Sequence, residues 1–117
     1  MSKIVVFNVP AHGHVNPTLP VVRELVSRGE QVAYYLTEEF EPQIRHTGAE
    51  FRRIEGLQMG SGPPPGVTAM GQSDPAMMRQ MMAAFFPRMM ADGLRLVPQL
   101  VERVRAEDAD CVVYDPF

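Results

Sequence analysis

The stretch that most constrains this chain joins a short apolar run to a polar loop and then to a helix. The run, Ile4–Phe7, is rich in β-branched residues, which is typical of a strand buried on both faces of a parallel sheet. Beyond the loop, apolar residues keep helical spacing from Leu19 to Val26, and Asn16 and Pro17 suit the N-cap and the first helical position. The chain is therefore predicted to open as strand, loop and helix, as α/β folds do.

The rest of the chain alternates predicted strands and helices. A second strand begins after Gly29, which suits the C′ position of the first helix, and the distance between the two strands fits a right-handed βαβ crossover. We therefore predict a Rossmann-like parallel sheet in the common doubly wound order 3-2-1-4, with flanking helices. The predicted segments are a strand at Gln31–Leu36, a short helix at Thr37–Thr47, a more polar strand near an edge at Ala49–Ile54, and a buried fourth strand at Ala109–Asp115 that contains Cys111 as a small buried hydrophobe.

Two further segments lie before the fourth strand. Glycine and proline are frequent in residues 56–73, so this segment is predicted to be a long loop, either a binding lid or a disordered stretch. Apolar pairs then recur every four residues from Met77 to Met90 and form one wide face of a predicted helix, which suits either a core or a pocket for an apolar ligand. Pro87 is predicted to kink or interrupt this helix, with a second piece at Leu94–Arg105.

Length and charge exclude several classes of protein. The 117 residues are enough for one hydrophobic core, and a net charge of −3 with scattered Lys and Arg argues against nucleic-acid binding. No run approaches the roughly 18 apolar residues of a membrane-spanning helix, and the N-terminus lacks the pattern of a signal peptide. We expect a cytoplasmic protein with neither a nucleic-acid partner nor a membrane span.

The loop after the first strand holds two of the three histidines and allows three interpretations. A dinucleotide-binding loop needs three glycines, for its turn, its phosphate contact and its helix packing, and only Gly13 is present. A metal-dependent hydrolase could use His12 and His14 as an H-x-H pair together with Asp115 or His46, although such a site normally needs further His or acidic ligands. We therefore expect no metal site here.

The third interpretation is a histidine base that an acid orients. In the order 3-2-1-4 the fourth strand lies beside the first, so Asp115 at its carboxyl end faces the histidine loop across the switch point of the sheet. A carboxylate that accepts a hydrogen bond from Nδ1–H holds the imidazole in the tautomer whose Nε2 can take a proton from a bound hydroxyl group. In the competing structural interpretation, His14 only caps or hydrogen-bonds the turn.

Four stretches of the sequence together resemble a known family. They are Phe7–Pro20 with its motif His12-Gly13-His14-Val15-Asn16-Pro17, Leu25–Gly29, Ala49–Phe51 and Asp110–Asp115. The chain resembles the start of the bacterial macrolide-type glycosyltransferases, which have the GT-B fold and use nucleotide sugars, usually UDP-glucose. The resemblance implies that His14 is the general base and that Asp115 orients it. It also implies that the acceptor oxygen attacks and inverts the anomeric carbon as UDP leaves, with no cofactor and no obligatory metal.

The same resemblance implies an incomplete N-terminal, acceptor-side domain over residues 1–117, with the donor-binding domain in the same or another chain. We expect this fragment alone to be inactive. Its acceptor is expected to be a small, largely apolar molecule of the macrolide, polyketide or flavonoid type, as in antibiotic biosynthesis or resistance. The alternative function is a non-catalytic binding or assembly module that forms a homo-oligomer to cover its exposed sheet. The expected acceptor-binding residues are His12, Asn16, Met77, Met81 and Phe85.

Overall fold

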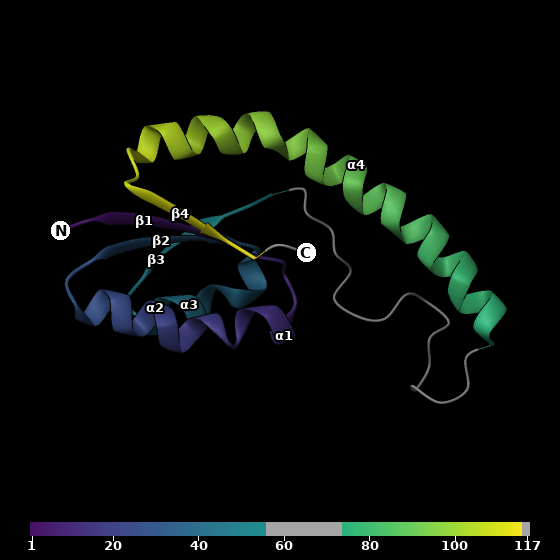
Figure 1. Ribbon diagram of the computed structural model, residues 1–117, viewed down its shortest axis with the longest axis horizontal. Helices are drawn as coiled ribbons and strands as arrows, with labels where there is room; N and C mark the ends of the chain where they lie inside the picture. Colours follow the sequence, from purple (N-terminus) through teal and green to yellow (C-terminus); the bar gives the residue numbers. More distant parts are fainter. Residues whose placement is uncertain (56–73, 116–117) are drawn as a thin grey trace. The chain divides into compact units, whose positions relative to one another are not determined.

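A computed structural model describes residues 1–55 and 74–115 of the chain (Figure 1). The predicted loop at residues 56–73 lies outside the described residues. The chain divides into two compact units, one made of Met1–Glu55 with Gln99–Phe117 and the other of Gly56–Pro98. In chain order the elements are β1 (Lys3–Phe7), α1 (His12–Val15), α2 (Thr18–Ser27), β2 (Gln31–Leu36), a 3₁₀ turn η1 (Glu38–Phe40), α3 (Glu41–His46), β3 (Glu50–Arg53), α4 (Pro75–Glu107) and β4 (Cys111–Tyr114).

The four strands form one parallel sheet in the order β3-β2-β1-β4, which confirms the predicted order. Strand β1 is internal, because Val5 lies opposite Ala33 of β2 on one side and opposite Val112 of β4 on the other. Strand β2 begins and ends at the predicted residues, and β3 is an edge strand of the described sheet. The carboxyl ends of β1, β2 and β4 therefore meet beside the loop that follows β1.

One face of the sheet packs against α1, α2 and α3 (Figure 1). Its apolar side chains come from alternate strand positions and from the inward sides of the helices, as the two periodicities require. Val15 and Ile44 are wholly buried, so α1 and α3 are both anchored to this core. The core comprises Ile4, Val6, Val15, Val22, Val32, Tyr34, Leu36, Phe40, Ile44, Ala49 and Phe51.

The last turns of α4, from Gln99 onward, lie on the opposite face of the sheet (Figure 1). There the carboxylate of Glu107 accepts hydrogen bonds from Arg52 Nε at 2.7 Å and from the Tyr35 hydroxyl at 2.8 Å, and it forms an ion pair with Lys3. Burial alone would raise the pKa of Glu107, but the hydrogen bonds from Arg52, Lys3 and Tyr35 outweigh it and lower the pKa to about 2. One carboxylate thus connects α4 to β1, β2 and β3.

Strand β4 is more exposed than its sequence predicts. Val112 and Val113 are 44% and 46% exposed, and Cys111 is an exposed residue rather than the small buried hydrophobe expected. The reason is the place of β4 in the sheet. Within the described residues β4 pairs with β1 only, so it lies at an edge of the sheet. Glu107 of α4 makes its polar contacts with Lys3 of β1 and with strands β2 and β3. The apolar sequence therefore predicted the strand correctly but its burial wrongly.

The start of the first long helix also differs from the prediction. Residues 12–15 form a separate helical turn, α1, and Asn16 is its C-cap with φ −55° and ψ −43°. An N-cap residue needs extended backbone, so Asn16 does not cap α2, and Pro17 stands directly before that helix instead. The predicted loop is thus itself helical at the two histidines.

Helix α4 is continuous over 33 residues, so neither Pro87 nor a break before Leu94 divides it. Pro87 supplies no N–H for the carbonyl of Ala83, but both residues are exposed, where water can replace the missing hydrogen bond. None of the Met and Phe residues from Met77 to Met90 is buried, contrary to a core role. The described part of the second unit is this one helix, which offers its apolar face no second element to pack against.

Among the residues that the structure describes, two glycines have left-handed backbone. Gly29, with φ +86°, follows α2 and confirms the predicted C′ glycine, and Gly48, with φ +90°, follows α3. A Cβ atom at Gly48 would lie 2.8 Å from Cγ1 of Val26 on α2, whereas a Cβ atom at Gly29 would meet nothing within 4 Å. The turn after α3 therefore packs directly on α2, and a side chain there would have to displace Val26.

We expect Gly48→Ala to destabilise the fold more than Gly29→Ala. Both changes force alanine into left-handed backbone, at about 1 kcal/mol each, but only the first adds a clash with Val26, for a total of about 2–4 kcal/mol. Urea unfolding followed by circular dichroism measures both free energies. Equal losses would show that the close approach to Val26 has no energetic consequence.

The Glu107 contacts predict how stability depends on pH. A pKa lowered from 4.5 to about 2 means that this carboxylate stabilises the fold above pH 4.5 and loses that contribution as the pH falls toward 2. Glu107→Gln should therefore lower the free energy of unfolding by about 2–3 kcal/mol at pH 7 and by little at pH 2. Glu102→Gln, an exposed site on the same helix, is the matched control. A loss that is the same at both pH values would contradict the role given to the Glu107 charge.

Candidate active site

The loop after β1 is short and folded. The Ala11 N–H donates to the Val9 carbonyl at 2.7 Å, and α1 begins at the next residue. Val15 is wholly buried in the core, while His12 and His14 are exposed. One apolar side chain therefore anchors the turn and leaves both histidines at the carboxyl end of β1.

His14 and Asp115 are in contact although they are 101 residues apart in the sequence. His14 Nδ1 lies 2.7 Å from Asp115 Oδ2, and the two side chains are 43% and 30% exposed. Asp115 directly follows β4, whose Tyr114 lies opposite Phe7 of β1, so the strand pairing carries the carboxylate to the histidine turn. The catalytic roles of the two residues stay a prediction.

The contact defines the tautomer of a neutral His14 ring. An ionised carboxylate only accepts hydrogen bonds, so Nδ1 carries the hydrogen and Nε2 carries the lone pair. Since both side chains are partly exposed, the pair contributes little to stability, about 0–1 kcal/mol as for other surface pairs. Its main effect is therefore on the orientation and the tautomer of the ring.

His12 has a different neighbour from His14. Its ring packs against the buried ring of Phe40, with 4.9 Å between the ring centroids. The two histidines of the H-x-H pair thus have separate partners. Within residues 1–55 and 74–115, no three His, Cys, Asp or Glu side chains gather into a group that could hold a metal ion. Asn16 is exposed at the end of α1, and the acceptor contacts expected for His12 and Asn16 stay predictions.

The apolar residues expected to bind an acceptor belong to α4 in the second unit. Met81 and Phe85 are half-buried, and Met77 is 50% exposed. The Phe85 ring meets that of Phe86 edge to face, with 6.1 Å between the centroids. The structure describes this unit by itself, so the acceptor-binding role of these residues stays a prediction.

Three residues that hold the histidine turn were not predicted from the sequence, namely Asn8, Thr18 and Tyr34. Asn8 Nδ2 donates to the carbonyl of His14 at 3.0 Å, and Thr18 Oγ1 donates to the carbonyl of Val15 at 2.7 Å. Both side chains also contact the Tyr34 hydroxyl, at 2.9 Å and 2.7 Å. The signals in the sequence are weak. Asn8 is a polar residue directly after the apolar run Ile4–Phe7, and Tyr34 brings a hydroxyl group into the apolar run Gln31–Leu36.

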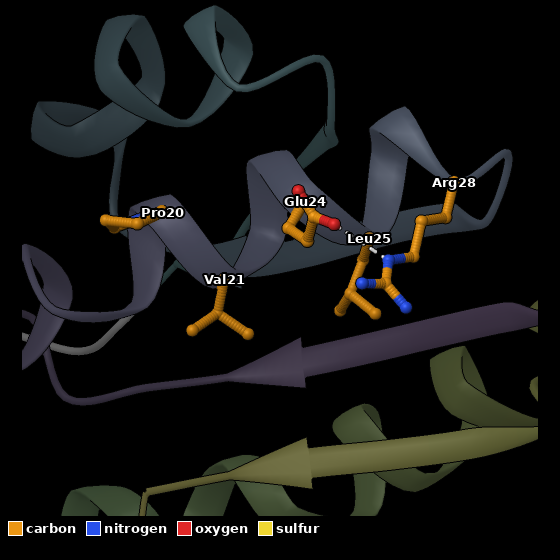
Figure 2. A pocket seen from close by; sticks show the side chains of 5 residues that line it. All are labelled: Pro20, Val21, Glu24, Leu25 and Arg28. Carbon is orange, nitrogen blue, oxygen red and sulfur yellow. Dashed lines mark hydrogen bonds and ion pairs between the residues drawn. The ribbon is translucent and has the colours of Figure 1, made fainter.

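An open apolar hollow lies along α2 (Figure 2). None of the predicted site residues lines it, so it has no part in the candidate site. Its lining residues are Pro20, Val21, Glu24, Leu25 and Arg28, of which Glu24 and Arg28 form an ion pair at 2.8 Å. No helix in the part of the chain that the structure describes is long and apolar enough to cross a membrane.

Proteins of similar sequence are glycosyltransferases. The NDP-glycosyltransferase YjiC of Bacillus subtilis (strain 168) is 32% identical over 114 residues, which are 96% of this chain and 26% of that protein. The oleandomycin glycosyltransferase of Streptomyces antibioticus is 30% identical over 114 residues, which are 97% of this chain and 24% of that protein. No family model matches the chain.

Solved structures of similar fold are also glycosyltransferases. CalG4, the calicheamicin glycosyltransferase, matches with a TM-score of 0.69 and 25% identity, over 98% of this chain and 27% of that one. By sequence and by fold, the chain is thus related over nearly its whole length to macrolide-type nucleotide-sugar glycosyltransferases with the GT-B fold, which confirms the resemblance seen in the sequence. It spans about a quarter of the length of these relatives.

Proposed function

We propose that this chain is the acceptor-side part of an inverting glycosyltransferase in which His14 is the general base and Asp115 orients it. The observation that carries the proposal is the 2.7 Å contact between His14 Nδ1 and Asp115 Oδ2 at the carboxyl end of the sheet. The similarity to glycosyltransferases over nearly the whole chain supports it. A histidine held in this way presents Nε2 as a proton acceptor, which is what activation of a hydroxyl group needs.

In the proposed reaction the acceptor hydroxyl donates a hydrogen bond to Nε2 of His14. As the acceptor oxygen attacks the anomeric carbon, its proton passes to Nε2, and the bond from that carbon to the phosphate oxygen breaks with its electron pair leaving on UDP. Attack and departure on opposite sides invert the carbon. The Asp115 carboxylate stabilises the imidazolium that forms, and general-base catalysis of this kind contributes about 10²–10⁴ in rate.

The proposed donor is a UDP-sugar, with UDP-glucose the first choice. We place its binding site mainly outside residues 1–117, because the chain spans only about a quarter of its relatives. The proposed acceptor is a small, largely apolar molecule of the macrolide, polyketide or flavonoid type. Half-buried, flexible Met side chains suit such varied apolar shapes. The proposed acceptor contacts are His12, Asn16, Met77, Met81 and Phe85.

The exposure of β4 favours a second candidate, a non-catalytic assembly module. Val112, Val113 and Tyr114 are apolar side chains exposed on one strand, and a second copy of the chain could cover them. Light scattering during size-exclusion chromatography measures this association. A monomer at all concentrations would remove the candidate, whereas a dimer that Val113→Glu disrupts would support it.

A chimera tests the catalytic proposal. Residues 1–117 replace the corresponding segment of the Bacillus subtilis relative, and mass spectrometry follows glucoside formation from UDP-glucose and a flavonoid. We expect His14→Ala to lower kcat by about 10²–10⁴-fold, because the hydroxyl group loses its base. The Kd of UDP-glucose should change little, because the donor is proposed to bind elsewhere.

His46→Ala is the matched control for that experiment, since His46 is an exposed histidine on α3 that has no role in the proposed site. Its kcat should stay within about twofold of the unaltered chimera. A chimera that retains full turnover after His14→Ala would rule out the base assignment.

Residues 1–117 alone are expected to transfer no sugar. The proposed acid and base are both present, but without a bound donor the acceptor oxygen has no anomeric carbon to attack. The same assay on the purified chain measures this, with the His14→Ala chain as the blank. Product above the blank would show that a donor site lies within these residues.

A further inference from the structure

The turn that carries His14 rests on hydrogen bonds whose hydrogens can all be placed. Thr18 Oγ1 has one hydrogen and donates it to the Val15 carbonyl at 2.7 Å. In the 2.7 Å contact between Thr18 Oγ1 and the Tyr34 hydroxyl, Tyr34 is therefore the donor. The Tyr34 oxygen in turn accepts from Asn8 Nδ2 at 2.9 Å, and the second hydrogen of Nδ2 goes to the His14 carbonyl at 3.0 Å.

The orientation of the Asn8 amide is determined in the same way. Its oxygen accepts the Val9 N–H at 2.7 Å, so its nitrogen must face Tyr34 and the turn. The Tyr34 hydroxyl thus stands between Asn8 and Thr18, accepting from one and donating to the other. Phenylalanine at this position could do neither.

These bonds satisfy groups that a one-turn helix cannot satisfy by itself. The last carbonyls of α1, those of His14 and Val15, have no later turn of helix to donate to them. Asn8 at the end of β1 and Thr18 at the start of α2 supply the donors, and Tyr34 on β2 is fully buried beneath both. The backbone that carries the His14 ring is therefore held from the interior of the sheet.

We propose that Tyr34 is a positioning residue, whose buried hydroxyl acts through Asn8 and Thr18 to hold the α1 turn in the orientation that aims the His14 ring at Asp115. The catalytic part of this inference rests on the proposed role of His14 as the base. The structural part, the hold on the ring, stands on the hydrogen bonds alone. Tyr34 is fully buried and acts only through its two partners.

The neighbouring residue provides an internal control. Tyr35 is also buried on β2, but its side chain lies on the opposite face, where its hydroxyl donates to Glu107 at 2.8 Å. Tyr35→Phe removes one buried hydroxyl group from the same strand without touching the histidine turn. Thr18→Val and Thr18→Ser form a second matched pair, because only valine removes the hydroxyl that Tyr34 contacts.

The primary experiment measures the ring of His14 in the chain itself. Imidazole ¹⁵N chemical shifts, recorded where the ring is neutral and assigned with His14→Gln, give the fraction of the tautomer with hydrogen on Nδ1. Amide hydrogen exchange at Val15 and Asn16 reports the hold on the turn. We expect Tyr34→Phe and Thr18→Val to lower that fraction and to speed exchange at least about tenfold, while Tyr35→Phe and Thr18→Ser leave both near the original values.

Kinetics in the chimera connect the ring to the reaction. Tyr34→Phe should lower kcat by about 10–100-fold with little change in the KM of the acceptor, because a misaimed base slows the chemical step more than binding. If Tyr34→Phe does not fold, the two Thr18 variants decide the same question.

Two results would overturn the inference: an unchanged tautomer and exchange in both Tyr34→Phe and Thr18→Val, or an equal effect of Tyr35→Phe, which would indicate a general loss of stability. Failure of the proposed function is distinguishable from both. In that case His14→Ala leaves kcat unchanged while the tautomer still depends on Tyr34.

Discussion

The pairing of β1 with β2 on one side and β4 on the other is the constraint on which the candidate site depends. Parallel strands end at the same edge of a sheet, so this order brings the histidine turn after β1 to the carboxylate after β4. The same pairing sets Tyr34 of β2 beside Val6 of β1, one residue pair before the strand ends, within reach of Asn8. Asn8 follows β1, Asp115 follows β4 and Tyr34 lies in β2, so the proposed catalytic pair and its support depend on three strands. His14 and Asp115 are 101 residues apart in the sequence, and Asn8 and Tyr34 are 26 residues apart.

Much of this arrangement could be predicted from the sequence because it follows from topology and from apolar patterning. The run Gln31–Leu36 predicts a strand, and the strand in the structure begins and ends at those two residues. Once the order 3-2-1-4 is assumed, Asp115 has to lie at the histidine loop, whatever the intervening residues do. Such rules depend on the order of elements and on their spacing, which a sequence displays directly.

What could not be predicted depends on tertiary contacts that leave no periodic signal. Asn16 has the chemistry of an N-cap, but residues 12–15 form a helical turn that the buried Val15 anchors to the core, and Asn16 is the C-cap of that turn. The apolar run at Val112 has the composition of a core strand, and only the placement of the helices shows that it is exposed. The role of Tyr34 could not be predicted for a different reason. Its side chain belongs to an apolar strand, and nothing in the sequence pattern indicates that its hydroxyl group contacts Asn8 and Thr18.

Adjacent tyrosines on opposite faces of β2 also limit how this chain can change in length. Tyr34 supports the histidine turn and Tyr35 meets the Glu107 carboxylate, so inserting or deleting one residue before them would exchange the two hydroxyl groups between faces. One inserted residue would place Ala33 under the histidine turn, and one deleted residue would place Leu36 against Glu107, so each change would remove one of the two hydroxyl groups from its contact. A single substitution in β2 changes one side chain on one face, whereas an insertion or deletion within the strand changes the side chains on both faces at once.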